Sequence, residues 1–115
     1  MKKRSLVLVL ALSLLVSLLP LSSMAENADI TGKVVIYTSM YQDIIDMMDE
    51  ALAKEFPNCD VEFFYGGTGT LQTKLAGEME VGTLGCDMLM VAEPAYSLEL
   101  KEGGWLHPYL TDARN

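Results

Sequence analysis

A stretch rich in glycine and threonine, Tyr65–Leu71, holds the residues best suited to binding chemistry. A strand-like apolar run, Val61–Tyr65, leads into it, and a helix-like run from Leu71 to Met79 follows. Backbone N–H groups in such a turn and at a helix N-terminus point away from the chain and bind anions. The stretch therefore predicts an anion-binding turn. The alternative is a sharp turn in which threonine only caps a helix.

Polar residues also follow two other predicted strands. The run 33–37 leads to Thr38, Ser39 and Tyr41, and the run 87–91 leads to Glu93. Short, continuous apolar runs are typical of strands that are buried on both faces of a parallel sheet. In such sheets ligands bind beyond the carboxyl ends of the strands. We therefore expect one ligand-binding edge, formed by Thr38, Ser39, Tyr41, Gly67, Thr68, Gly69, Thr70 and Glu93.

Glu93 is an unusual residue for its position. It stands before Pro94, at the start of a predicted helix, where serine, threonine, aspartate and asparagine are the preferred residues. Glutamate gains there mainly from the helix dipole. Two interpretations remain open: a surface acid that stabilises the helix, or a ligand contact such as a metal ligand or a partner for a ligand amine.

Three predicted helices position these residues. They cover about 41–56, 70–81 and 94–102; a Ser39–Gln42 capping box opens the first, and Gly103 ends the third at the C′ position. The alternation predicts an α/β fold with the order βαβαβα, three parallel strands and helices on both faces. The third strand is expected to leave an exposed apolar edge, which favours association.

The first 25 residues have the pattern of a secretory signal peptide. A positive head, Met1–Arg4, precedes the uncharged apolar run Leu6–Leu19, and small residues stand at Ser23 and Ala25. We expect an exported protein, periplasmic or extracellular, with a flexible segment at 26–32. The 90 residues after position 25 contain five basic and sixteen acidic residues, a net charge of −11. Such a charge argues against binding to nucleic acid or to anionic membranes.

Catalysis is not expected, and no motif for it is found. His107 is the only histidine and lies in a different part of the chain from the predicted ligand-binding edge, so no Ser–His–Asp set can be assembled there. We interpret His107 as a packing or surface residue. An enzyme that used Glu93 as general base would lack a second titratable group at the edge. Cys59 and Cys86 could form a disulfide in an exported chain. If their strands are not neighbours, however, their Cα atoms lie beyond the ~7 Å that a bridge spans.

The order of these motifs resembles a known family. Residues 33–39 read KVVIYTS, 61–75 VEFFYGGTGTLQTKL, 86–96 CDMLMVAEPAY and 100–109 LKEGGWLHPY. This succession is similar to the N-terminal part of bacterial extracellular solute-binding proteins of ABC importers. Within them it resembles the ferric-ion and phosphonate branch, the ferric-binding-protein-like cluster.

The resemblance implies a fold and a function. It implies a two-lobed, non-catalytic protein that captures a small oxyanion (a phosphonate or organophosphate) or a ferric ion and delivers it to a membrane permease. Residues 33–110 would be an incomplete N-terminal lobe, a partial periplasmic-binding-protein lobe, with a polar tail at 111–115. The complete protein is expected to be a monomer without a cofactor. The alternative is a ligand-sensing domain that signals to a membrane receptor.

The resemblance also bears on iron. Ferric-binding members use a histidine after the first strand and a glutamate after a later strand of this lobe. Glu93 falls at the matching glutamate, whereas the histidine position falls near Tyr41. Glu93 is therefore a metal ligand only if the cargo is ferric ion.

Overall fold

A computed structural model describes residues 27–111, and its elements follow the predicted order. The strands are β1 (Gly32–Thr38), β2 (Cys59–Tyr65) and β3 (Met88–Met90), and the helices are α2 (Gln42–Glu55), α3 (Thr68–Glu80) and α4 (Pro94–Glu102). The predicted signal peptide and most of the predicted tail lie outside the described residues. Within residues 27–111, no helix has the length and apolarity needed to cross a membrane.

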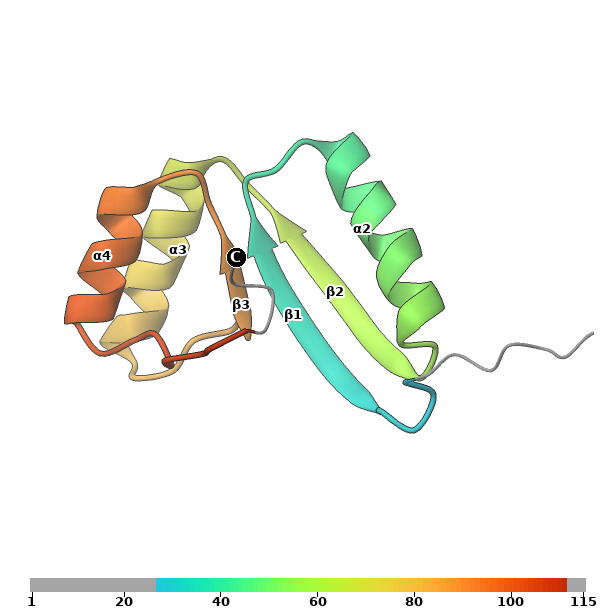
Figure 1. Ribbon diagram of the computed structural model, residues 1–115. Coiled ribbons are helices and arrows are strands. Elements are labelled where there is room, and N and C mark those ends of the chain that lie inside the picture. Colours follow the sequence, from blue (N-terminus) through green and yellow to red (C-terminus); the bar gives the residue numbers. More distant parts are fainter. Residues whose placement is uncertain (1–26, 112–115) are drawn as a thin grey trace, which may run out of the picture.

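The three strands form one parallel sheet in the order β2-β1-β3. Thr38, the last residue of β1, is the register partner of Tyr65 on one side and of Met90 on the other. The carboxyl ends of all three strands therefore lie side by side. Helix α2 lies on one side of the sheet, and α3 and α4 lie on the other (Figure 1). These observations confirm the predicted α/β fold with helices on both faces.

The main core lies between the sheet and the α3–α4 layer. Alternation along β1 places Val35 and Tyr37 on this face, because successive side chains of a strand point to opposite sides. Partly buried Val35 packs there against a cluster of buried residues made of Tyr37, Leu71, Leu75, Tyr96 and Leu100. On the opposite face, Ile45 of α2 is buried, whereas Met47 of the same helix is 66% exposed.

The predicted capping box at the start of α2 is wrong. Tyr41 is the N-cap residue and makes no side-chain capping bond, and the Gln42 amide donates to Asp46 within the helix. The Ser39 N–H, which the capping box would use, donates instead to the Met90 carbonyl at 3.1 Å. Tertiary pairing between β1 and β3 therefore replaces the local motif.

The end of α4 differs from the prediction by one residue. Gly103 is the C-cap with φ −72°, and Gly104 takes the left-handed conformation with φ +77°. The Trp105 N–H donates to the Leu100 carbonyl, and the Gly104 N–H donates to the Lys101 carbonyl. These two bonds form a Schellman motif, in which the C′ residue is the left-handed one. Trp105 is thereby held against the last turn of α4.

Candidate functional site

The carboxyl ends of β1, β2 and β3, with the helix starts that follow them, form the candidate site, which we call the carboxyl edge. Three backbone bonds hold it together around Thr38. The Gly66 N–H donates to the Thr38 carbonyl, and the Ser39 N–H donates to the Met90 carbonyl, each at 3.1 Å. The Met40 N–H donates to Thr38 Oγ1, also at 3.1 Å. The loops after β1 and β2 are thus fixed relative to the end of β3.

All three helices begin at this edge, because each follows the carboxyl end of a strand (Figure 1). Their N-cap residues are Tyr41, Gly67 and Glu93, and none of these three makes a side-chain capping bond. The first-turn N–H groups of a helix have no partner within the helix itself. The carboxyl edge therefore carries three positive helix-dipole ends whose N–H groups the caps leave available.

Thr38 occupies a different place from the one expected of a ligand contact. It is 1% exposed, and its hydroxyl accepts the Met40 N–H. The side chain alternates with Tyr37 along β1 and so faces the α2 side of the sheet, not the solvent above the edge. Thr38 therefore supports the loop backbone, and a ligand at the edge would meet its neighbours instead.

The remaining predicted residues of the first loop lie at the edge. Ser39 is half-buried, and Tyr41 is 79% exposed at the start of α2. The Tyr37 phenol points away from this edge into the core, where it donates to Glu78. Of the two tyrosines near the end of β1, therefore, only Tyr41 is accessible.

The glycine–threonine stretch is shorter as a loop than predicted. Gly67 is the N-cap of α3, and Thr68, Gly69 and Thr70 form its first turn. The helix begins two residues before position 70, and the Leu71 N–H closes its first turn by donating to the Gly67 carbonyl at 3.0 Å. Gly67, Gly69 and Thr70 are exposed, and Thr68 is half-buried.

Gly66, which the prediction left out of the site, is buried. A Cβ atom there would lie 3.4 Å from both Leu71 Cδ2 and Thr70 Cγ2. Its N–H carries the bond to Thr38 described above. Its position directly after the apolar strand was the available signal, since glycine at such a site permits close approach of the backbone.

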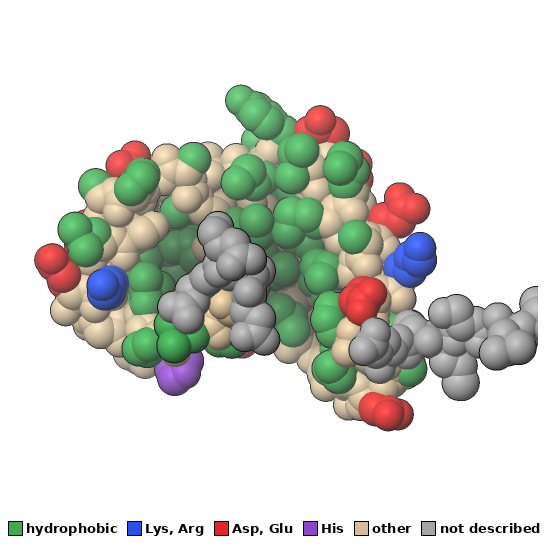
Figure 2. Space-filling model, in the orientation of Figure 1, with side chains coloured by type: hydrophobic (Ala, Val, Ile, Leu, Met, Phe, Trp, Pro, Cys, Tyr) green, Lys and Arg blue, Asp and Glu red, His purple; other side chains and the backbone are tan. Residues whose placement is uncertain are grey.

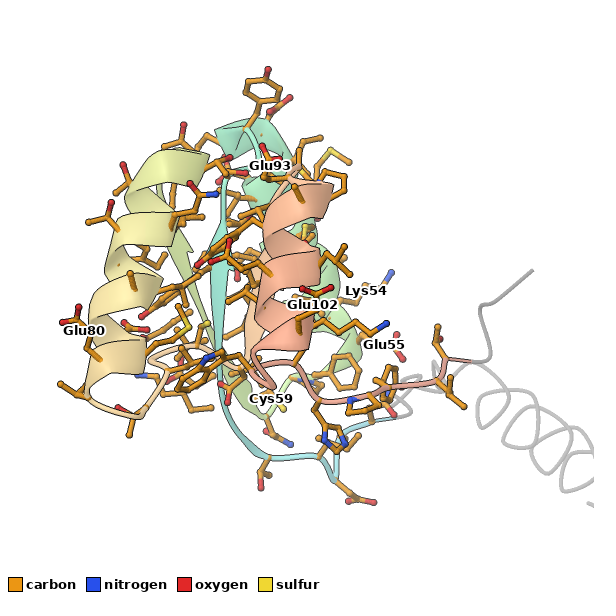
Figure 3. The ribbon with its side chains drawn as sticks, turned by 90° about the vertical axis from the view of Figure 1, so that its left-hand side faces the viewer. Lys54, Glu55, Cys59, Glu80, Glu93 and Glu102 are labelled. Atoms are coloured by element: carbon orange, nitrogen blue, oxygen red, sulfur yellow. The ribbon has the colours of Figure 1, made fainter. Side chains whose placement is uncertain are left out.

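Glu93 lies at the start of α4, at the upper end of that helix in Figure 3. Its side chain is half-buried, and its backbone carbonyl accepts the Ser97 N–H at 3.1 Å and the Ser97 hydroxyl at 3.3 Å. Among residues 27–111, no group of three histidine, cysteine, aspartate or glutamate residues could hold a metal ion.

A polar network next to the core was not predicted. The Tyr37 hydroxyl donates to Glu78 Oε1 at 2.8 Å, and the Gly85 N–H donates to Glu78 Oε2 at 2.8 Å. Lys74 pairs with Glu78 at 3.0 Å and lies about 5 Å from the ring centroids of Tyr37 and Phe64. The i, i+4 spacing of Lys74 and Glu78 was the available signal. The Lys74 ammonium is thus held by its contacts with Glu78 of α3 and Tyr37 of β1.

These contacts shift the acidity of the network. Burial, together with the bond to Glu78, raises the pKa of the Tyr37 phenol. Burial also acts to raise the pKa of the Glu78 carboxyl, but the Gly85 N–H, Lys74 and the Tyr37 hydroxyl outweigh it and lower that pKa. Glu78 is therefore held as a carboxylate that joins α3, β1 and the loop before β3.

The cysteines are not bridged. Cys59 begins β2, Cys86 lies just before β3, and β1 lies between these two strands. Cys59 Sγ donates to the Ile30 carbonyl at 3.4 Å, and burial raises the pKa of the Cys86 thiol.

Comparison with known proteins identifies no family. A scan against protein-family models, a search of curated proteins and a search of solved structures each found no match.

Proposed function

We propose that this chain supplies the binding edge of the solute-binding component of an ABC importer, which captures a small oxyanion outside the cytoplasmic membrane. One observation carries the proposal: three helix N-termini with no side-chain cap lie together at the carboxyl edge. Helix N-termini are favourable positions for phosphate-like groups, because their N–H groups and dipoles both act on the anion. The preferred ligand is a phosphonate or an organophosphate.

The side chains at the edge have complementary roles in this proposal. Ser39, Thr68 and Thr70 would donate hydroxyl bonds to the anion, while the N–H groups of the first turn of α3 act beside them. Glu93 would accept a bond from a protonated oxygen or an amine of the ligand. Thr38 would hold the two loops in place from below. Ferric ion is the second candidate ligand, because Glu93 is a carboxylate at the same edge.

A calorimetric titration with methylphosphonate tests the proposal. We expect saturable binding that the Thr68→Val/Thr70→Val double variant weakens by about tenfold or more, since each lost bond removes about 1 kcal/mol. Thr73→Val is the matched control, because its hydroxyl is engaged by the Gly69 carbonyl within α3. It should bind as the parent chain does.

Ferric nitrilotriacetate supplies the second arm of the experiment. Loading through a phenolate would give a visible charge-transfer band that is lost in Glu93→Gln. Such a band without methylphosphonate binding would replace the oxyanion by iron as the cargo. If neither probe binds, the proposed cargo class is wrong.

A further inference from the structure

The loop before β3 is attached to the rest of the fold by two carboxylates. Glu78 of α3 accepts the Gly85 N–H and the Tyr37 hydroxyl, each at 2.8 Å. Asp87 Oδ2 accepts the Val35 N–H at 2.9 Å, and the Asp87 N–H donates to the Val35 carbonyl, also at 2.9 Å. We call Glu78 and Asp87, with the N–H groups whose bonds they accept, the carboxylate clasp. It joins α3, the loop and β1.

The Asp87 side chain lengthens the attachment of β3 to β1. The paired positions of the two strands begin at Ile36 and Met88. Val35 precedes this pair, and its N–H receives a carboxylate oxygen. A backbone N–H in a sheet needs such a partner, because an unpaired one costs free energy. The clasp thus stands at the amino end of β3, opposite to the carboxyl edge.

Gly85 lets the loop approach Glu78 closely. A Cβ atom there would lie 2.5 Å from the Tyr37 hydroxyl oxygen and 2.9 Å from Glu78 Oε1, so a larger residue would push these groups apart. The Glu78 side chain is only 19% exposed, so water replaces a lost bond there incompletely. Asp87 is exposed, and water competes for its bond. Glu78 is therefore the stronger member of the clasp.

We propose that the carboxylate clasp is an acid-sensitive switch, which closes the loop 83–87 at neutral pH and lets it open in acid while the helices stay folded. Hydrogen bonds to an ionised carboxylate are roughly twice as strong as those to a neutral acceptor, so protonation weakens both members. The five buried residues of the main core lie outside the loop, and parts of a protein open at a lower free energy than the whole. This inference does not depend on the proposed ligand of the carboxyl edge.

The charges around the clasp favour its closed form. In Figure 2 the charged side chains stand mainly around the outline of the molecule, and hydrophobic side chains gather around the hollow between α2 and the α3–α4 layer. Lys74 pairs with Glu78 at 3.0 Å, and His107 lines the same cavity as Asp87. Both are cationic in acid, so both favour the carboxylate forms. The charged and titratable groups near the clasp are Tyr37, Lys74, Cys86, His107, Tyr109 and the Lys33–Glu62 ion pair.

The acidity of Glu78 sets the pH range of the switch. Burial acts to raise its pKa, but the Gly85 N–H, Lys74 and the Tyr37 hydroxyl outweigh burial and lower the pKa. The contribution of Glu78 to the closed loop is therefore complete above its ordinary pKa of about 4.3 and is lost as pH falls through the lowered value. We expect the loop to be closed above about pH 4.3 and to open below it.

Cys86 reports on the clasp, because it lies between Gly85 and Asp87 and is half-buried. The chain is treated with 4,4′-dithiodipyridine, which reacts with thiols in acid, and peptide mass spectrometry gives the rate at each cysteine. Cys59, at the start of β2, is the reference, so the ratio of the two rates removes the common effect of pH on the reaction. From about pH 6 to about pH 3.5 the ratio should rise about tenfold or more, because two charge-assisted bonds are lost. Far-UV circular dichroism should stay at its neutral value.

Two double variants separate the clasp from the general effect of acid. Glu78→Gln/Asp87→Asn keeps an acceptor oxygen at each position but cannot titrate, so the ratio should stay constant over the same pH range. Glu78→Gln alone should remove most of the rise. Glu80→Gln/Asp49→Asn removes two exposed acids of α3 and α2 and should keep the rise of the parent chain.

The pH dependence of these variants decides the proposal. A constant ratio in Glu78→Gln/Asp87→Asn, beside a rise in the parent chain and in the control variant, supports it. The absence of a rise in the parent chain, or an equal rise in Glu78→Gln/Asp87→Asn, overturns it. A rise that appears only together with a loss of helical dichroism overturns it as well, because the loop would then open only by global unfolding.

Discussion

At the scale of single residues, Thr38 connects the parts of the carboxyl edge. Its carbonyl accepts a bond from Gly66 and its hydroxyl accepts one from Met40. The sequence indicated that Thr38 stands at a strand end, but not which way it faces. That depends on the strand's neighbours, because only the packed sheet decides which alternate side chains α2 covers.

We expect Thr38→Val to lower the free energy of unfolding by about 1–2 kcal/mol, because the half-buried Met40 N–H would lose its partner without a change in side-chain volume. Urea denaturation measures the loss. Thr83→Val, at an exposed loop position, is the control and should change stability by less than about 0.5 kcal/mol. Equal stability of the two variants would show that the Thr38 hydroxyl does not support the loop.

Glu78 makes the stability of the fold depend on pH in the acidic range. Its pKa is lowered in the folded chain, so its stabilising effect is complete above its ordinary pKa of about 4.3 and is lost as pH falls through the lowered value. Unfolding measured between neutral and strongly acidic pH should therefore show a steeper loss for the parent chain than for Glu78→Gln. Glu102→Gln, at the exposed end of α4 (Figure 3), should keep the parent's pH profile.

At the scale of elements, replacing either of two glycines with alanine should change stability in opposite directions, because their backbone conformations differ. Gly104 has φ +77°, so Gly104→Ala should cost about 1–2 kcal/mol. Gly77 lies inside α3, and a methyl group added there would meet no atom within 4 Å. Gly77→Ala should therefore stabilise the chain by about 0.5–1 kcal/mol. Thermal unfolding measures both, and a Gly104→Ala variant as stable as the parent would contradict the Schellman ending of α4.

The elements themselves were predictable because each has a strong local signal. Continuous apolar runs marked the three strands, and Pro94 fixed the start of α4 at the residue observed. Helix starts without proline were less certain. Ser39 had the spacing of a capping residue, yet its N–H pairs with β3, fifty-one positions away in the sequence. Local spacing does not reveal such a competing partner.

At the scale of the whole molecule, the parallel topology explains why a binding edge could be predicted at all. Any βαβαβα chain brings its strand ends to one side of the sheet, so Ser39, Thr68 and Glu93 were expected there from order alone. The strand order β2-β1-β3, which places β1 in the middle of the sheet, was harder to foresee. Local sequence patterns do not show which strands pair.

The central position of β1 also affects the order in which the strands pair during folding. Gly32 meets Cys59 of β2, 27 positions away, whereas Ile36 meets Met88 of β3, 52 positions away. Nearer contacts close first, since longer loops cost more entropy to close and non-local pairing slows folding. The β1–α2–β2 unit can therefore assemble while the third strand is still unattached. The carboxyl edge becomes complete only when β3 docks, so a ligand that spans it would act on the last step of folding.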